Sequence, residues 1–231
     1  MIIKGLQKTT LLDFPGKVAC TVFTAGCNFR CPFCHNASLV TRPADVDEIS
    51  EESFFSYINK SKGILDGVCI TGGEPLLSRG IEDFIRKIKQ TGLLVKLDTN
   101  GAYPEKLKTL LDEGLVDYVA MDIKNSREKY AQTVGLHEYP AKIEESIKLI
   151  MEKAPDYEFR TTVVRELHTT QDIDNITKWI SGAKRYFLQT YVDSGDILCE
   201  GFSAYNATEM LEMLEISRKN LPCTVLRGID T

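Results

Sequence analysis

The chain has 231 residues, of which 43% are hydrophobic and 26% charged, and its formal net charge is −5 at pH 7. This size and composition are typical of a globular protein with one full core, so we expect a single domain spanning residues 1–231. The negative charge argues against a broad basic face for nucleic acid, and no apolar run is long enough to cross a membrane. Residues 1–5 lack the apolar region of a signal peptide, so we expect a cytoplasmic protein.

Apolar, β-branched runs alternate with helical patterns from the turn at Pro15–Gly16 onward. The expected strands are residues 17–24, 67–71, 94–99, 118–124, 157–164 and 185–192, with a short seventh at 224–227. The expected helices are residues 53–61, 81–90, 104–113, 141–153, 172–181 and 207–219.

Repeated strand–helix units predict parallel strands joined by right-handed crossovers. Six such units in one domain favour an α/β fold, a partial (β/α)6 barrel, and a flat doubly wound sheet is the alternative. In both architectures, ligands bind beyond the C-terminal ends of the strands. Residues that follow the strands are therefore the first candidates for a functional site.

Three cysteines lie within eight residues directly after the first expected strand. Cys27, Cys31 and Cys34 have the spacing C-x3-C-x2-C, and Phe33 precedes the last thiol. Three thiolates can hold three irons of a [4Fe-4S] cluster, whereas a fully ligated cluster normally takes four cysteines. The fourth iron would keep an open coordination position, which is where a substrate can bind. The motif therefore indicates a catalytic cluster.

A zinc site is the structural alternative for these thiols, with His35 as a fourth ligand. His35 is adjacent to Cys34, however, and zinc sites usually consist of two separated ligand pairs, of which the chain has no second. Cys20 and Cys69 lie in expected strands and are interpreted as buried structural thiols. Cys199 and Cys223 are isolated, and the sequence leaves their roles open.

Polar residues collect at the ends of the other strands. Gly72-Gly73-Glu74-Pro75 follows the second strand, and Asp98 ends the third with the turn Asn100–Gly101. Asp122 and Lys124 are two residues apart, so they face the same side of a strand. A charged pair inside a barrel is costly unless something compensates it, which indicates a ligand.

Several of these residues have a structural interpretation of comparable weight. Gly72 and Gly73 alone are compatible with a simple turn. Arg160 and Gln189 lie within the fifth and sixth strands, where a salt bridge or hydrogen bond would account for them equally well. The two histidines at 137 and 168 fall in connecting segments and are expected on the surface.

Residues 27–34 together with residues 72–75 resemble the motifs of the radical S-adenosylmethionine (SAM) superfamily, over essentially the whole chain. The resemblance implies that Cys27, Cys31 and Cys34 bind the cluster and that SAM binds the open iron through its amino and carboxylate groups. It implies further cofactor-binding residues: Phe33 along the adenine, Gly72, Gly73 and Glu74 at the ammonium, Lys124 at the carboxylate, Asp98 and Asp122 at that carboxylate through a monovalent cation, and Arg160.

The reaction implied by this resemblance is reductive cleavage of SAM to a 5′-deoxyadenosyl radical, which abstracts a hydrogen atom from the substrate. Residues 6–16 and 24–36 resemble activating proteins of anaerobic ribonucleoside-triphosphate reductase. The implied substrate is a glycine of a partner glycyl radical enzyme, and flavodoxin or ferredoxin would supply the electron. Alternatives are a pyruvate formate-lyase-type activase, an enzyme that rearranges a 7-deazaguanine-type precursor held by Arg160, Gln189 and Tyr191, or a zinc-stabilised binding module.

Overall fold

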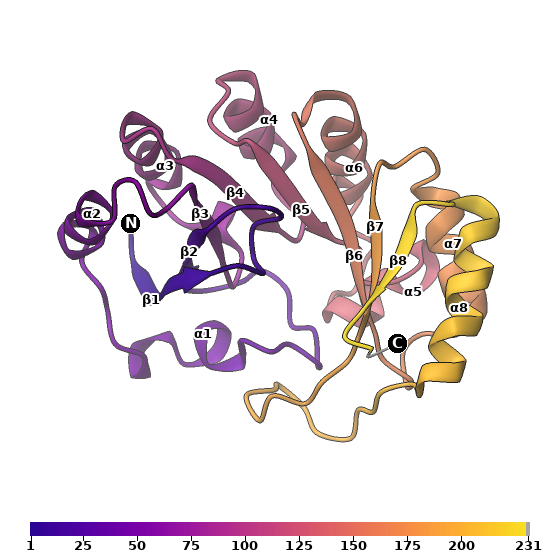
Figure 1. Cartoon of the computed structure of the whole chain (residues 1–231). Coiled ribbons are helices and arrows are strands. Elements are labelled where there is room, and N and C mark those ends of the chain that lie inside the picture. The colour runs from indigo at the N-terminus through magenta and orange to yellow at the C-terminus, as the bar shows by residue number, and fades with distance from the viewer. Residues whose placement is uncertain (230–231) are drawn as a thin grey trace.

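The computed structural model describes residues 1–229, which contain one eight-stranded sheet with the strands in sequence order (Figure 1). The first two strands pair antiparallel, and every later neighbour pairs parallel. The strands are β1 (Ile3–Thr10), β2 (Ala19–Thr24), β3 (Gly67–Gly72), β4 (Leu94–Thr99), β5 (Tyr118–Asp122), β6 (Tyr157–Val163), β7 (Tyr186–Thr190) and β8 (Thr224–Arg227).

Helices follow each strand from β2 to β7, and in Figure 1 most of them cover the outer side of the curved sheet, whereas α1 lies apart from them, below β1 and β2 in this view. They are α1 (Ala37–Thr41), α2 (Glu51–Lys60), α3 (Ile81–Gln90), α4 (Pro104–Asp112), α5 (Arg127–Val134), α6 (Lys142–Lys153), α7 (Thr170–Trp179) and α8 (Ala207–Asn220), with short 3-10 turns at Pro43–Asp45 and Pro75–Leu77. Six consecutive strand–helix units in one sequentially ordered parallel sheet confirm the α/β partial barrel.

Three elements were not expected from the sequence: β1, α1 and α5. Strand β1 reads IKGLQKTT and has no clean alternation of apolar and polar residues, because it is an edge strand paired on one side with β2. Helix α1 has only five residues and no side-chain hydrogen bond from its own N-cap, Asn36. Tertiary contacts therefore define these elements more than local sequence does.

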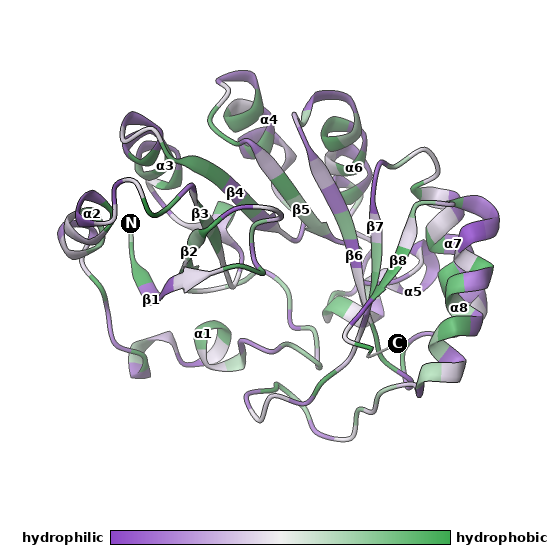
Figure 2. Cartoon of the chain, viewed as in Figure 1, coloured by the Kyte–Doolittle hydropathy of each residue, from purple (hydrophilic) through white to green (hydrophobic). Residues whose placement is uncertain are grey.

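The main apolar core lies between the sheet and its helices. Helix α3 illustrates the pattern, since Ile81, Phe84, Ile85 and Ile88 are all buried at the spacing of one helical face. Figure 2 shows the same division on the other helices, with hydrophobic and hydrophilic stripes along each ribbon. A second apolar cluster (Phe14, Ala19, Tyr118 and Ala120) lies on the other side of the sheet, and Phe14 and Tyr118 line a second cavity of about 380 Å³ together with charged side chains.

Residues 191–206 form the long connection between β7 and α8 and run past α1 on the same side of the molecule (Figure 1). The Asp196 carboxylate accepts hydrogen bonds from the backbone N–H and hydroxyl of Ser38, at 3.1 and 2.7 Å. The Cys199 N–H donates to the Pro32 carbonyl at 2.9 Å. This connection therefore braces the segment that carries the three cysteines. Within residues 1–229, no helix is both long enough and apolar enough to cross a membrane.

Candidate active site

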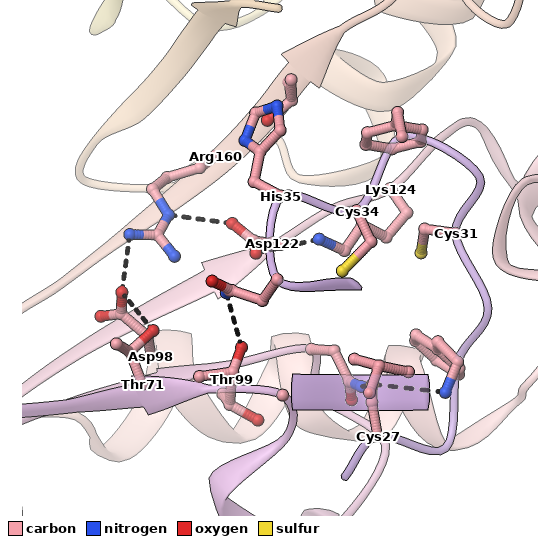
Figure 3. A pocket seen from close by; sticks show the side chains of 18 of the residues that line it. Cys27, Cys31, Cys34, His35, Thr71, Asp98, Thr99, Asp122, Lys124 and Arg160 are labelled. Atoms are coloured by element: carbon pink, nitrogen blue, oxygen red, sulfur yellow. Dashed lines mark hydrogen bonds and ion pairs between the residues drawn. The ribbon is translucent and has the colours of Figure 1, made fainter. Parts of the chain in front are cut away.

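A cavity of about 250 Å³ lies at the C-terminal ends of the strands and gathers most of the residues predicted from the sequence (Figure 3). Ten of the eleven expected cluster- and cofactor-binding residues line it, and Glu74 is the exception. The ten are Cys27, Cys31, Phe33, Cys34, Gly72, Gly73, Asp98, Asp122, Lys124 and Arg160. Gln189 lines the cavity too, so the six expected strand ends do converge on one space.

The cysteine loop, residues 25–36, is fixed by two buried aromatic rings. Phe29 and Phe33 are only 2% and 4% exposed. Phe29 meets Tyr130 edge-on, and Phe33 meets His168 edge-on, each with ring centroids 6.4 Å apart. These contacts alternate with the cysteines along the loop. Packing against α5 and against the connection between β6 and α7 thus sets the directions in which the three thiols can point.

The surroundings of Cys27 and Cys31 favour the protonated form of both thiols. The Cys27 sulfur accepts from the Phe29 N–H at 3.3 Å and lies 3.6 Å from Asn100 Nδ2. Burial raises the pKa of Cys31 to about 12 and also raises the pKa of Cys27. Lys124 lowers both pKa values but does not offset burial, so these thiols keep their protons until metal ligation releases them.

The zinc alternative needs His35 beside the three thiols. The described residues 1–229 contain no group of three or more His, Cys, Asp or Glu side chains placed to hold one metal ion. With Zn–S bonds of about 2.3 Å, tetrahedral ligation would bring the sulfurs to about 3.8 Å from one another. The His35 ring instead stacks on Tyr191, with centroids 5.6 Å apart. In a [4Fe-4S] cube each thiolate binds its own iron, so three sulfurs spread around one cavity are suitable ligands.

Gly72 and Gly73 let the end of β3 approach the cysteine loop closely. The Gly73 N–H donates to the Thr24 carbonyl at 3.0 Å, and the next N–H donates to the Gly26 carbonyl at 2.8 Å. A Cβ atom on Gly73 would lie 2.0 Å from the Gly26 oxygen, and Gly72 has a φ of +117°. Only glycine fits such contacts without displacing the backbone. The two sequence motifs therefore touch each other directly.

Glu74 does not face the cavity. Its carboxylate is fully buried and accepts hydrogen bonds from the Leu76 N–H, the Thr99 hydroxyl and the Asn100 N–H, at 3.1, 2.9 and 2.7 Å. Burial raises the pKa of Glu74 to about 7, although these hydrogen bonds oppose the shift. In this arrangement both oxygens of Glu74 hold the loop after β4 against the loop after β3.

Five charged side chains form a continuous row beside the cysteines: Lys96, Asp98, Arg160, Asp122 and Lys124 (Figure 3 labels all but the first). Lys96 pairs with Asp98, and the Arg160 guanidinium spans both carboxylates, with NH1 3.0 Å from Asp98 and Nε 2.9 Å from Asp122. Lys124 lies 3.0 Å from the other oxygen of Asp122. Cations and carboxylates alternate along the whole row.

The ion pairs within this row keep its side chains ionised despite their burial. Burial alone would raise the pKa of Asp122, but Arg160 and Lys124 hold it well below its usual range. Burial alone would lower the pKa of Lys124, but the Asp122 carboxylate more than offsets this effect and raises that pKa above its usual range. The row as a whole carries one net positive charge, but Lys96 does not line the cavity, and the charges of the four members that do line it sum to zero. The Lys124 ammonium beside the cysteines is the part of this wall suited to an anionic group.

The structure corrects the sequence interpretation of one of the two histidines. His168 was expected on the surface, but it is fully buried, with Nε2 2.9 Å from the Lys124 carbonyl. Its Nδ1 accepts from the Val164 N–H at 3.1 Å, so Nε2 carries the proton. No local pattern marks such a residue, because its partners are 4 and 44 positions away. His137 is exposed, as expected.

Asn100 makes a contact that sequence reasoning missed. The expected turn is present, with Gly101 at a φ of +79° and the Ala102 N–H donating to Asn100 Oδ1 at 2.9 Å. The amide nitrogen of Asn100, however, points to the Asn28 side chain at 2.9 Å and to the Cys27 sulfur. Asn100 thus links the end of β4 to the first cysteine.

Comparisons with known proteins agree with this geometry. The profile described as the radical SAM superfamily matches residues 21–180, more than two thirds of the chain. This chain belongs to the radical SAM superfamily. Such enzymes use a [4Fe-4S] cluster and SAM, and the cavity of this radical SAM chain presents three thiols and the Lys124 ammonium, which fit both.

Relatives of this radical SAM enzyme are similar to it along much or all of their length. A Methanocaldococcus jannaschii protein named as a glycyl-radical enzyme activating enzyme is 30% identical over 240 residues, covering 99% of this chain and 97% of that protein. Pyruvate formate-lyase 1-activating enzyme of Escherichia coli is 28% identical over 57% of this chain and 55% of its own. The crystal structure of Streptococcus suis SuiB bound to precursor peptide SuiA superposes with a TM-score of 0.72 at 14% identity, covering 90% of this chain and 48% of SuiB, and supports the fold alone.

Proposed function

We propose that this radical SAM enzyme activates a glycyl radical enzyme by abstracting a hydrogen atom from one of its glycines. The full-length similarity to a protein named for that activity supports the reaction, and the shared cavity of the cysteines and the charged row supports the chemistry. The partner we propose is an anaerobic ribonucleoside-triphosphate reductase, because residues 6–16 and 24–36 resemble its activating proteins.

We assign the cluster to Cys27, Cys31 and Cys34 and SAM to the rest of the cavity. The single observation that carries this assignment is that the three thiols and Lys124 line the same 250 Å³ space. Lys124 uses one ammonium hydrogen on Asp122 and can donate others to a carboxylate. Phe33 supplies an apolar wall, and Gly73 lines the cavity with its backbone.

The Gly72 carbonyl is less accessible for the SAM ammonium, since it already accepts from Asn36 Nδ2 at 2.9 Å. Glu74 would act indirectly, by holding the Asn100 loop whose side chain meets Cys27. A monovalent cation between Asp98 and Asp122 would have to share both carboxylates with Arg160.

Cys27, Cys31 and Cys34 would hold the cluster, and its chemistry there would be the one-electron reduction that cleaves SAM to methionine and a 5′-deoxyadenosyl radical able to take the glycine hydrogen. The chain's own part is to bind the SAM carboxylate, to orient the sulfonium toward the cysteine loop and to exclude water. We propose flavodoxin or ferredoxin as the electron donor. All seven cysteines lie in the described part of the chain as free thiols, which supports a reducing compartment such as the cytoplasm.

The test is activation of a purified partner under strict anoxia. The cluster-loaded chain, SAM and reduced flavodoxin should produce a glycyl radical signal by electron spin resonance on an anaerobic ribonucleotide reductase. About one 5′-deoxyadenosine should form for each glycyl radical. A partner whose glycine is replaced by alanine is the control, and so is Cys31→Ala of this chain, which should lose the cluster and the signal.

Two outcomes would change the proposal. A signal on pyruvate formate-lyase but not on the reductase would keep the activase and replace the partner. Conversion of a 7-deazaguanine precursor, with no radical on any candidate partner, would overturn the activase.

A further inference from the structure

We propose that the Arg160 guanidinium takes the place of a metal cation between Asp98 and Asp122, so that this enzyme binds SAM without a monovalent ion. The inference rests on SAM binding in this cavity and makes Arg160 a positioning residue. It is independent of which protein or small molecule the enzyme acts on.

All four carboxylate oxygens of the pair already meet nitrogen donors. On Asp98, Oδ1 pairs with Lys96 and Oδ2 lies 3.0 Å from Arg160 NH1. On Asp122, Oδ1 lies 2.9 Å from Arg160 Nε and Oδ2 lies 3.0 Å from Lys124. A metal ion that bridged the two carboxylates would need at least one oxygen from each. It would therefore have to share these oxygens with Arg160 or the flanking lysines, or displace one donor from each carboxylate.

No other carboxylate near Arg160 in the described residues is free to replace Asp98 and Asp122 as its partner. The remaining carboxylate within its reach is Glu158, 4.0 Å from NH1. Glu158 is itself held by both terminal nitrogens of Arg227, at 2.9 and 3.0 Å, and by the Tyr118 hydroxyl at 2.8 Å. Moving Arg160 from Asp98 and Asp122 would leave a buried guanidinium without full compensation, which is strongly unfavourable.

The charge balance favours the same assignment. The row from Lys96 to Lys124 already carries one net positive charge, and SAM, with one carboxylate, one ammonium and one sulfonium, brings one more. An additional metal ion would raise the row to two positive charges at a site where Arg160 and Asp98 are each only 15% exposed. Uncompensated charge is costly at such burial. The guanidinium is part of the chain, so its positive charge is present without binding a cation from solution.

The guanidinium also holds the two carboxylates in place, as a bridging metal ion would. Its planar fork fixes the separation of the two carboxylates, because Nε and NH1 are part of one rigid group. Asp122 in turn holds Lys124, the residue that faces the SAM carboxylate. Arg160 thus positions Lys124 through Asp122.

The first experiment needs no variant. SAM is titrated into the anoxic enzyme with its cluster oxidised, so that no cleavage occurs, in choline, sodium or potassium chloride at equal ionic strength. We expect dissociation constants that agree within twofold. A saturable gain of tenfold or more on adding potassium would overturn the proposal.

The second experiment replaces the guanidinium. In choline chloride, Arg160→Gln should weaken SAM binding at least tenfold, and potassium or methylguanidinium should restore at least a third of the lost affinity. Arg165→Gln is the matched control, because it removes a 2.8 Å arginine–carboxylate pair with Glu209 outside the barrel and should bind SAM like the parent. Unchanged affinity of Arg160→Gln in choline would refute the assignment.

A structural readout separates this inference from the proposed function. Crystals of the parent soaked in rubidium chloride should show no anomalous peak between Asp98 and Asp122, whereas Arg160→Gln should show one. A rubidium ion on both carboxylates of the parent would overturn the inference even if the glycyl radical forms. Absence of that radical on every partner would overturn the proposed function and leave these SAM affinities unaffected.

Discussion

Lys124 is held in the cavity at both its side chain and its backbone. Its ammonium contacts Asp122, and its backbone carbonyl is fixed by the buried His168 ring. The spacing Asp-x-Lys at a strand end made both charged groups predictable from sequence. The histidine was not predictable, because its partners come together only in the folded chain.

We expect Lys124→Ala to weaken SAM binding about tenfold or more, since the carboxylate loses a charged hydrogen-bond donor in a partly buried site. Equilibrium titration of the anoxic, cluster-loaded protein measures the effect. Lys178→Ala removes a 2.7 Å exposed pair with Asp174 and should change nothing. Equal affinities for the two variants would remove Lys124 from the SAM site.

Glu74→Gln should lower the stability of the protein by about 1–3 kcal/mol, because an amide cannot accept hydrogen bonds at both former oxygens. Whichever way the amide is turned, its NH2 group faces either the Asn100 N–H or the Leu76 N–H. Denaturant unfolding measures the change, with the exposed Glu212→Gln as the control. A stable Glu74→Gln that loses SAM affinity would instead indicate direct contact with the cofactor.

At the level of elements, the cysteine loop, α1 and the connection from β7 to α8 behave as one unit. Asp196 provides the α1 N-terminus with the hydrogen-bond acceptor that Asn36 does not. The six main helices and seven parallel strands were predictable from periodicity, but this unit was not. Its contacts join residues 158 positions apart in a segment without a regular apolar pattern.

Removing that acceptor with Asp196→Ala should loosen the unit locally. Loss of a capping interaction typically costs about 1 kcal/mol, which corresponds to about fivefold faster amide exchange where exchange proceeds by local opening. Hydrogen exchange followed by mass spectrometry should show this change in residues 27–40 and 191–203. Helix α3 should exchange as before, and unchanged rates in both segments would contradict the role of Asp196.

Across the whole molecule, the charged interior makes stability depend on pH, and His168 contributes a defined part. Burial lowers the pKa of His168 below its ordinary value of 6.5, so the folded state binds a proton less readily than the unfolded chain. Its stabilising contribution is present above pH 6.5 and is lost as the pH falls below that value. Glu74 acts in the opposite direction, because its pKa is raised to about 7 and its contribution fades as the pH rises from about 4.5 to 7.

The two effects can be separated by substitution. The loss of unfolding free energy between pH 7.5 and 5.5 should be smaller in His168→Gln than in the parent, measured by urea unfolding under anoxia. His137→Gln, at an exposed position, should follow the parent curve. Parallel curves for all three proteins would mean that His168 titrates normally in the folded state.

The barrel as a whole was predictable because strand–helix alternation is a chain-long pattern. The antiparallel β1 was not, since an edge strand has only one neighbour and need not alternate. The sequence predicted which strand ends form the site, but not which charged side chains pair with Arg160. Arg160 could have faced a substrate or a salt bridge, and only the register of β5 and β6 places it opposite Asp122.

The fit of Gly73 against Gly26 changes how inactive variants at the glycine motif should be interpreted. A methyl group there would collide with the Gly26 carbonyl, which directly precedes Cys27. The substitution would therefore shift the Cys27 thiol as well as any SAM contact made by Gly73. An inactive Gly73→Ala protein would then be expected to be deficient in iron. Iron and sulfide analysis should accompany every assay of such a variant, since lost turnover alone would not distinguish a damaged cluster from a missing SAM contact.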